Sequence, residues 1–152
     1  MEQRIQDFIR EQHIATICCI DQAHHPYCFN CMYVFNEVKG LLYFKSGSGT
    51  HHAKLIKENP MLSGTVLPDQ INLLVVKGIQ FSGHLLSGDE DINKEAYRIY
   101  HKRLPLAFVR PGEIFVVAID AIKMMDSHHG IAKKYIWQRA EQMNLSPGNV
   151  NN

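Results

Sequence analysis

The chain has 152 residues, and its 16 lysines and arginines against 15 aspartates and glutamates give a formal net charge of +1 with histidine neutral. This balance excludes the strongly basic surface of proteins that read a nucleic-acid backbone. Hydrophobic residues at 45% and charged residues at 20% are typical of one soluble globular domain and exclude a disordered or fibrous protein. No apolar run reaches the ~20 residues of a membrane span, and no signal peptide is evident. We therefore expect a cytoplasmic protein without nucleic-acid or membrane partners.

The first half of the chain predicts a helix followed by an antiparallel meander. Residues 1–12 carry Ile5, Phe8 and Ile9 at helical spacing, with charged residues between them. Strands are then expected over residues 13–21, 27–36 and 41–46. Because the turns between these strands are short, each strand is expected to pair with the next one along the chain.

The second half mixes strands with two further helices. The expected elements are a helix over residues 51–59, strands over 61–67 and 71–86, a helix over 89–103, and strands over 113–120 and 121–125. Gly78 and Gly83 predict a bulge or bend in the long strand. Six or seven antiparallel strands with two or three helices, and no strand-helix alternation, predict a mainly β (α+β) protein built on a small barrel. We expect a single domain over residues 1–145 and a frayed polar tail over 146–152.

The four cysteines are expected to be reduced thiols in a cytoplasmic protein. Cys28 and Cys31 have the spacing of a zinc knuckle or a redox motif, but Cys18 and Cys19 do not supply the second pair that a structural zinc site takes. A redox motif also places its first cysteine at a helix N-terminus, whereas this segment is predicted to be a strand. Histidine doublets occur three times, and their adjacent side chains diverge. Buried thiols are therefore favoured, and no metal site is predicted.

A candidate anion site lies between the third strand and the helix over residues 51–59. The strand leads through Lys45 and Ser46 into a Gly-Ser-Gly loop, and Thr50 is the natural N-cap of a helix that starts with His51 and His52. A phosphate there would accept from the free helical N–H groups and the Thr50 hydroxyl, with positive charge from Lys45 or a protonated histidine. A capped surface helix with a solvated lysine explains the same pattern.

Two strands carry faces that a ligand would fit. Residues 27, 29, 31, 33 and 35 share one face of the second strand, which predicts the core, whereas Cys28, Asn30, Met32 and Val34 share the other. The second face is apolar apart from Asn30, which indicates a dimer interface, a bound planar ligand or ordinary barrel packing. In the long strand, Gln80 shares a face with small and polar residues, so a ligand edge or plain surface polarity explains it equally well.

Three segments taken together resemble the pyridoxamine 5′-phosphate oxidase-like FMN-binding split barrels. They are P-Y-C-F-N-C-M-Y-V-F, G-L-L-Y-F-K-S…T-H-H-A-K-L-I-K-E-N-P and K-G-I-Q-F-S-G, and the resemblance covers nearly the whole chain. The segments K-R-L-P, I-K and G-I-A-K-K-Y-I-W, which begin at Lys102, Ile122 and Gly130, look closest to a small, uncharacterised bacterial branch. The resemblance implies a split β-barrel that forms a homodimer with two FMN sites at the subunit interface.

The resemblance also implies which residues hold the cofactor. It places the second strand along the isoalloxazine and the loop-helix junction at the phosphate, with a glutamine, a lysine and a tryptophan from later strands nearby. The residues that it assigns to FMN are Phe29, Asn30, Cys31, Met32, Phe44, Lys45, Ser46, Thr50, His51, His52, Gln80, Lys133 and Trp137. Relatives commonly have an Arg-Lys pair where this chain has its His-His pair, so a nearby lysine would have to supply the fixed charge. Trp137 either approaches the flavin or packs the tail onto the partner subunit.

These patterns predict an FMN-binding homodimer that acts as a flavin-dependent oxidoreductase on an unidentified small molecule. The tail holds only Arg139 after Trp137, whereas true oxidases of the group carry a pair of arginines there, so a typical pyridoxamine phosphate oxidase is not expected. No side chain stands out as a general acid or base. A non-catalytic carrier or sensor that binds FMN, haem or a deazaflavin, and an interaction domain with an empty site, are the alternatives.

Overall fold

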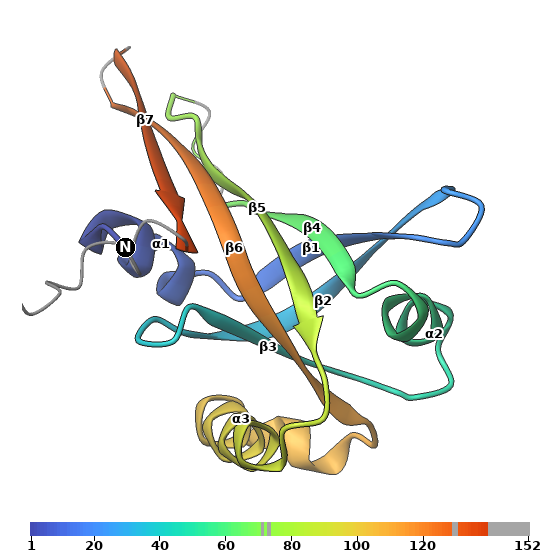
Figure 1. Cartoon of the computed structure of the whole chain (residues 1–152). Coiled ribbons are helices and arrows are strands. Elements are labelled where there is room, and N and C mark those ends of the chain that lie inside the picture. The colour runs from blue at the N-terminus through green and yellow to red at the C-terminus, as the bar shows by residue number, and fades with distance from the viewer. Residues whose placement is uncertain (71, 73, 129–130, 140–152) are drawn as a thin grey trace, which may run out of the picture.

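The computed structural model describes residues 1–70, 72, 74–128 and 131–139 of the chain (Figure 1). Its elements are α1 (Gln3–Glu11), β1 (Ile14–Ile20), β2 (Pro26–Asn36), β3 (Leu41–Ser46), α2 (His51–Glu58), β4 (Met61–Val66), β5 (Lys77–Leu86), α3 (Glu90–Arg103), the 3-10 helix η1 (Pro105–Val109), β6 (Glu113–His128) and β7 (Ile131–Gln138). The predicted tail over residues 146–152 and the domain end at 145 lie outside the described residues. Within the described residues, no helix is long and apolar enough to cross a membrane.

The strands form one antiparallel sheet that closes on itself. Their order is β3-β2-β1-β4-β5-β6-β7, and a further pairing of β3 with β6 closes six of the seven strands into a barrel. β7 pairs with β6 and lies outside the closed ring (Figure 1). The structure therefore confirms the predicted mainly β, split-barrel fold with helices packed around it.

The barrel splits where β2 and β3 separate. Only the second half of β2, from Tyr33 to Asn36, pairs with β3, whereas Pro26–Met32 pairs with β1 alone. The end of β3 turns away in the same place, because Lys45 and Ser46 pair only with β6. The β1–β2 hairpin consequently projects from the barrel (Figure 1), and an opening is left between its β2 edge and the end of β3.

Two apolar clusters fix the strands and the helices around this opening. The larger cluster fills the barrel and includes Ile5 and Phe8 of α1, which are 0% and 2% exposed, as the helical spacing predicts. The smaller cluster packs α3 on the outside of the sheet through Ala96 and Tyr100. Complete burial of one such large side chain contributes ~1.5–3 kcal/mol, so α3 is held firmly against the sheet beside the split.

The structure differs from the sequence-based prediction in three strands. β5 begins at Lys77, not at residue 71, and β6 is a single strand where two were expected. β7 was not predicted because it is an edge strand with mostly exposed side chains, which gives no clear alternation of apolar and polar residues. The predicted core face of β2 is buried only at its barrel end, since Tyr27 lies on the projecting hairpin and is 39% exposed.

Candidate functional site

A cavity of about 630 Å³ opens at the split between β2 and β3. Residues of β2 and β3 line one side, and the end of α3, η1 and the residues that follow it line the other. The lining residues are Ile14, Phe29, Asn30, Cys31, Met32, Lys45, Ser46, Gly47, His52, Tyr100, Arg103, Leu104, Pro105, Leu106, Ala107, Arg110 and Pro111. This volume lies within the ~300–1,000 Å³ of small-molecule and cofactor sites, and the mainly apolar lining with a few polar groups is typical of them.

A cluster of two hydroxyls and an imidazole stands at one end of the cavity. The Nε2 atom of His52 lies 2.6 Å from Ser46 Oγ and 3.2 Å from Thr50 Oγ1. Thr50 is the N-cap of α2, as predicted: its hydroxyl donates to the Gly47 carbonyl and accepts from the Ala53 N–H. Since a helix leaves its first N–H groups without intrahelical partners, those of His51 and His52 remain open, and the junction has the donors that a phosphate needs.

The two histidines at the start of α2 point to different surroundings. The His52 ring stacks on Phe29, with centroids 3.9 Å apart and planes 12° apart, and so closes the gap between α2 and β2. The His51 ring instead meets Tyr27 edge-on, at 4.9 Å between centroids. Burial, and secondarily the neighbouring His51, lower the pKa of His52, so at neutral pH His52 contributes hydrogen bonding and not charge.

Lys45 supplies a positive charge on the opposite side of the cavity from this cluster. Consecutive residues of a strand point to opposite faces, so Ser46 faces α2 while Lys45 faces α3 and η1. The Lys45 ammonium lies 3.2 Å from His101 Nε2 and donates to the Ala107 carbonyl at 2.9 Å. Both acceptors are uncharged, so the lysine charge is held in place without being neutralised by them.

His101 is a buried support for Lys45. Its side chain is 2% exposed and stacks on Phe108 with centroids 4.1 Å apart. Its Nδ1 lies 2.9 Å from the Tyr97 carbonyl, which can only accept, so Nδ1 carries the proton. Nε2 is then left with a lone pair for the lysine. The ring is therefore a neutral imidazole with both nitrogens engaged.

The structure brings together most, but not all, of the residues predicted to hold a cofactor. Those lining the cavity are Phe29, Asn30, Cys31, Met32, Lys45, Ser46 and His52, and Thr50 is bonded to two of them. Phe44 is fully buried behind the cavity, against Phe29 and Phe115. Gln80, on β5, and Lys133, on β7, are exposed and lie outside the cavity lining. Trp137 is 6% exposed and packs in the core of its own chain.

Sequence reasoning missed the wall of the cavity that α3 and η1 provide. It treated the helix over 89–103 as structure and used the K-R-L-P segment only for the family resemblance, although His101, Arg103 and Arg110 all stand at the cavity or behind its lysine. A histidine on the apolar side of an otherwise charged helix was the available signal. This histidine indicates a role at the cavity only once β3 is known to lie beside α3, and the sequence alone does not show that.

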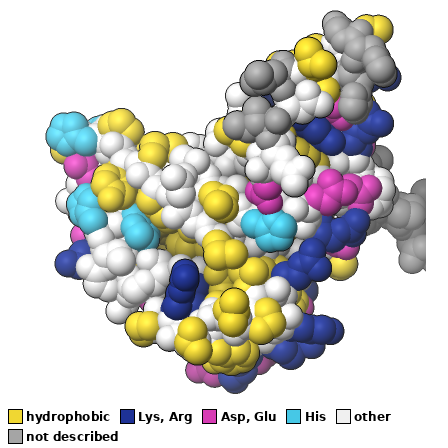
Figure 2. Space-filling view, turned by 180° about the vertical axis from the view of Figure 1, so that it is seen from behind, with side chains coloured by type: hydrophobic (Ala, Val, Ile, Leu, Met, Phe, Trp, Pro, Cys, Tyr) yellow, Lys and Arg dark blue, Asp and Glu magenta, His cyan; other side chains and the backbone are white. Residues whose placement is uncertain are grey.

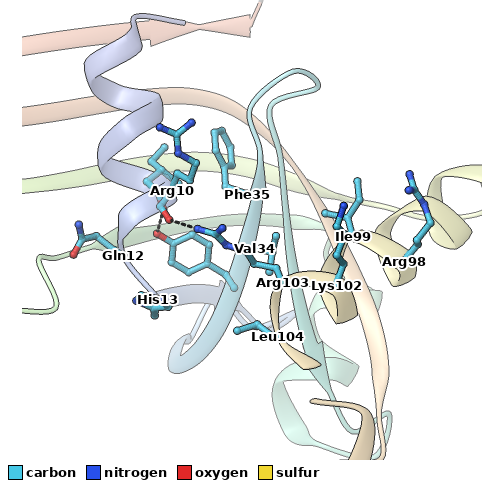
Figure 3. Close-up of a pocket in the computed structure, with 12 residues that line it drawn as sticks. Arg10, Gln12, His13, Val34, Phe35, Arg98, Ile99, Lys102, Arg103 and Leu104 are labelled. Atoms are coloured by element: carbon cyan, nitrogen blue, oxygen red, sulfur yellow. Dashed lines mark hydrogen bonds between the residues drawn. The ribbon is translucent and has the colours of Figure 1, made fainter. Parts of the chain in front are cut away.

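A second cavity, of about 420 Å³, lies between α1, β2 and α3 (Figure 3). It is rimmed by basic side chains, but several of them have partners within the fold: Arg10 pairs with Asp7 and Glu37, and His13 pairs with Asp69. Arg103 donates across the cavity to the Arg10 carbonyl near the end of α1 (Figure 3), where a cation also suits the helix dipole. Several of the polar groups around this cavity are thus already paired within the fold, and the cavity at the split is the candidate site.

Comparisons with solved structures agree with the split-barrel fold. The chain superposes on a haem-binding protein from Mycobacterium smegmatis with a TM-score of 0.69 and 10% identity, over 84% of this chain but only 54% of that one. It superposes on a FAD-binding protein from Mesorhizobium loti with a TM-score of 0.68 and 14% identity, over 84% and 96% of the two chains. An F420 reductase gives 0.59 and 15%, over 77% and 94%. At these identities the likeness concerns the fold alone.

Comparison with curated sequences gives the family. No family model matches the chain. A UPF0306 protein of Yersinia enterocolitica is 32% identical over 137 residues, which are 90% of this chain and 92% of that protein. One of Yersinia pestis is 33% identical over 141 residues, or 91% and 94%. With this identity over nearly the full length of both proteins, the chain belongs to the UPF0306 family.

Proposed function

We propose that the chain binds FMN in the cavity at the split and works as a homodimeric, flavin-dependent oxidoreductase on a small molecule. The observation that carries the proposal is the arrangement of the cavity: a phosphate-type donor cluster at Ser46, Thr50 and His52 at one end and a fixed lysine charge on the opposite wall. Two fold neighbours named as haem-binding and FAD-binding proteins and a third named as an F420 reductase support a large, flat cofactor in this fold.

The residues at the cavity fit a flavin phosphate better than they fit haem iron. The open N–H groups at the start of α2 and the Ser46 hydroxyl are donors for an anion, while the Thr50 hydroxyl donates to the Gly47 carbonyl and holds the loop in place. Haem iron takes an axial His, Cys thiolate, Met or Tyr. Both nitrogens of His101 have partners and His52 Nε2 faces the two hydroxyls, so neither histidine presents a free Nε2 to iron, and burial that raises the pKa of Cys31 to about 12 disfavours its thiolate. The donor set therefore favours FMN over the haem alternative.

The surface around the cavity supports a dimer. Ile14, Met32 and Leu106 line the cavity and yet are 53%, 44% and 84% exposed. Further apolar side chains of α3 and η1, including Phe108 and Val109, are also exposed, and Figure 2 shows hydrophobic side chains gathered at the lower end of one face, the end at which α3 and η1 lie in Figure 1. Apolar side chains clustered in this way are typical of a protein-protein contact. A partner chain here would also bring further residues, such as its Gln80 and Lys133, to the cofactor.

The protein's part in the reaction is to bind, orient and shield. A bound flavin would supply the hydride and electron transfer. Thr50 caps α2 and orders the loop before it, Ser46 holds a hydroxyl donor beside this junction, and Phe29 and Met32 offer apolar contact on the β2 side. Lys45 places a positive charge in the cavity, which favours an electron-rich group beside it. His101 keeps the ammonium in that position.

The first test is the visible absorption spectrum of the purified protein before and after addition of FMN. A two-band flavin spectrum, with saturable uptake of one FMN per chain, is expected. A Soret band would show that the protein binds haem and not a flavin. A colourless protein that takes up no FMN would support the interaction-domain alternative. Oxidation of a reduced nicotinamide by the loaded protein then separates an oxidoreductase from a carrier or sensor.

A matched pair of variants tests the phosphate end of the site. Thr50→Ala with His52→Ala is expected to weaken FMN binding at least about tenfold, or ~1.4 kcal/mol, because it removes a charge-assisted hydrogen bond. Lys54→Ala with Glu58→Ala changes two exposed positions of the same helix that are not assigned to the site and is expected to change the affinity less than about twofold. Equal affinity of the first variant and the wild type would contradict the assignment. For the dimer, a monomer that retains its flavin on dilution would contradict a shared site.

A further inference from the structure

The pairing of β1 with β2 places two cysteines directly opposite each other. The register pairs Cys18 with Cys28 and, two residues further along, Thr16 with Asn30. Cys18 is partly buried and Cys28 is exposed. Cys28 and Cys31, by contrast, are three residues apart in one strand and so point to opposite faces. The spacing seen in the sequence is therefore not the pair that the fold brings together.

The hydrogen bonds at the two ends of the hairpin fix the type of this pair. Antiparallel strands alternate hydrogen-bonded and non-hydrogen-bonded pairs. The Asp21 N–H donates to the His25 carbonyl at the turn, and the Tyr33 N–H donates to the His13 carbonyl at the far end. Asp21–His25 and His13–Tyr33 are therefore hydrogen-bonded pairs. The Cys18–Cys28 pair lies three residues along the strand from the first and five from the second. Because the two types alternate, an odd number of residues makes Cys18–Cys28 a non-hydrogen-bonded pair.

Side chains in pairs of this type lie close together. Opposite Cα atoms are ~4.5 Å apart in a non-hydrogen-bonded pair, against ~5.5 Å in a hydrogen-bonded one. The neighbouring pair of the same type shows the contact directly, since Thr16 Oγ1 donates to Asn30 Oδ1 at 2.7 Å. Disulfides join Cα atoms that are ~4.4–6.8 Å apart, and those at the edge of the range are strained and easily reduced. The pair thus lies at the short end of the range that a disulfide can span.

We propose that Cys18 and Cys28 form a reversible disulfide across the β1–β2 hairpin on exposure to peroxide. Each thiol loses one hydrogen as the sulfur-sulfur bond forms, and hydrogen peroxide takes up the two electrons and two protons and becomes two water molecules. A thiol reductant reverses the step and restores both side chains. Because Cys28 shares its face of β2 with Asn30, the bond would lie beside the cavity at the split.

The surroundings of the thiols assign a role to each. Cys28 is exposed on the projecting hairpin (Figure 1) and is the thiol that peroxide can reach, which gives a sulfenic acid and one water molecule. Cys18 is partly buried, and burial, together with the neighbouring Cys28 thiol, raises its pKa to about 11, so Cys18 acts second: it gives up its proton as its sulfur attacks the oxidised sulfur of Cys28, and the sulfenic oxygen leaves as the second water molecule. Burial raises the pKa of Cys31 to about 12, which makes that thiol unreactive in comparison.

The test is intact-mass and peptide analysis of the full-length chain after treatment with hydrogen peroxide and alkylation of the remaining thiols. The four free thiols are expected to become two, with full recovery after dithiothreitol. Cleavage before Asp21 separates the peptide with Cys18 and Cys19 from the peptide with Cys28 and Cys31, and fragmentation of the cross-linked pair, with the remaining thiols alkylated, identifies which two cysteines are bonded. Cys19→Ser with Cys31→Ala is expected to form the same bond, and Cys18→Ser with Cys28→Ser is expected to form none.

Every other result would overturn the proposal. Four thiols that all remain alkylatable, a bond that includes Cys19 or Cys31, a disulfide between two chains, or oxidation of Cys28 to an acid without a bond would each do so. The wild-type chain alone decides among these outcomes, so the conclusion does not depend on whether a variant folds. None of the measurements uses FMN, so they are independent of the proposed function.

Discussion

Replacing Lys45 by methionine tests whether the contact with His101 holds the lysine in the cavity. Methionine keeps an unbranched apolar stem but has no N–H group. The change removes the donor that lies 3.2 Å from His101 Nε2, in a side chain only 2% exposed, and it also frees the Ala107 carbonyl. A buried acceptor left without a donor costs about 1–3 kcal/mol. We expect Lys45→Met to lower the free energy of unfolding of the cofactor-free protein by that amount.

The second substitution is His101→Phe. In the wild type the His101 ring lies 4.1 Å from Phe108 and 4.2 Å from Tyr97 between ring centroids, and phenylalanine keeps these aromatic contacts. Alone, it leaves the Lys45 ammonium with one acceptor and the Tyr97 carbonyl without its donor. In the double variant both members of the contact are apolar, and replacing both partners of a hydrogen bond is far less costly than replacing one. The double variant is therefore expected to be more stable than the two single effects added together, by about 1 kcal/mol or more.

Urea unfolding of the four cofactor-free proteins measures this coupling energy. Independent sites add within about 0.3–0.5 kcal/mol, so a coupling energy below that value would refute the contact. Lys54→Met provides the control, because Lys54 is an exposed lysine on α2 and its replacement should change the free energy of unfolding by less than about 0.5 kcal/mol. If the contact is real, Lys45→Met should in addition weaken FMN binding, whereas Lys54→Met should not.

Two further predictions concern the phosphate end and the barrel. Burial lowers the pKa of His52 in the folded protein below its usual 6.5, which is the pKa expected in the unfolded chain. The stability that the neutral imidazole contributes is therefore fully present above pH 6.5 and is lost as the pH falls from there through the folded-state pKa. Urea unfolding of the cofactor-free protein from about pH 7 to about pH 5 should therefore show a steeper loss for the wild type than for His52→Gln, and parallel curves would contradict this. Gly83→Ala should cost about 1–3 kcal/mol, since its Cβ would lie 2.3 Å from the Ala118 carbonyl oxygen. Gly49→Ala, with nothing within 4 Å, should leave the thermal midpoint unchanged or slightly raised, and equal losses at the two glycines would contradict the packing argument.

The elements that the sequence predicted well are those whose side chains follow a clear period. The apolar spacing of α1 and the N-cap at Thr50 are local signals, and the structure confirms both. β7 has no such period, since it is an exposed edge strand. The start of β5 was predicted six residues too early, at residue 71 in place of Lys77, because the apolar residues before the strand continue its sequence pattern. Local patterns therefore predict elements, and they predict ends and edges poorly.

The candidate site shows the same limit at the level of tertiary structure. Its β2, β3 and α2 residues lie within about 25 residues of one another in sequence, and their types and alternation were enough to indicate a candidate anion site and an apolar face of β2 for which a planar ligand was one of three explanations. The wall formed by α3 and η1 depends on a contact between Lys45 and His101, which are 56 residues apart. That contact exists because β3 pairs with β6 while α3 packs across the same strands, and no local period encodes such a crossing. The wall that the sequence could not predict is thus the one that turns a capped helix beside a lysine into a cavity.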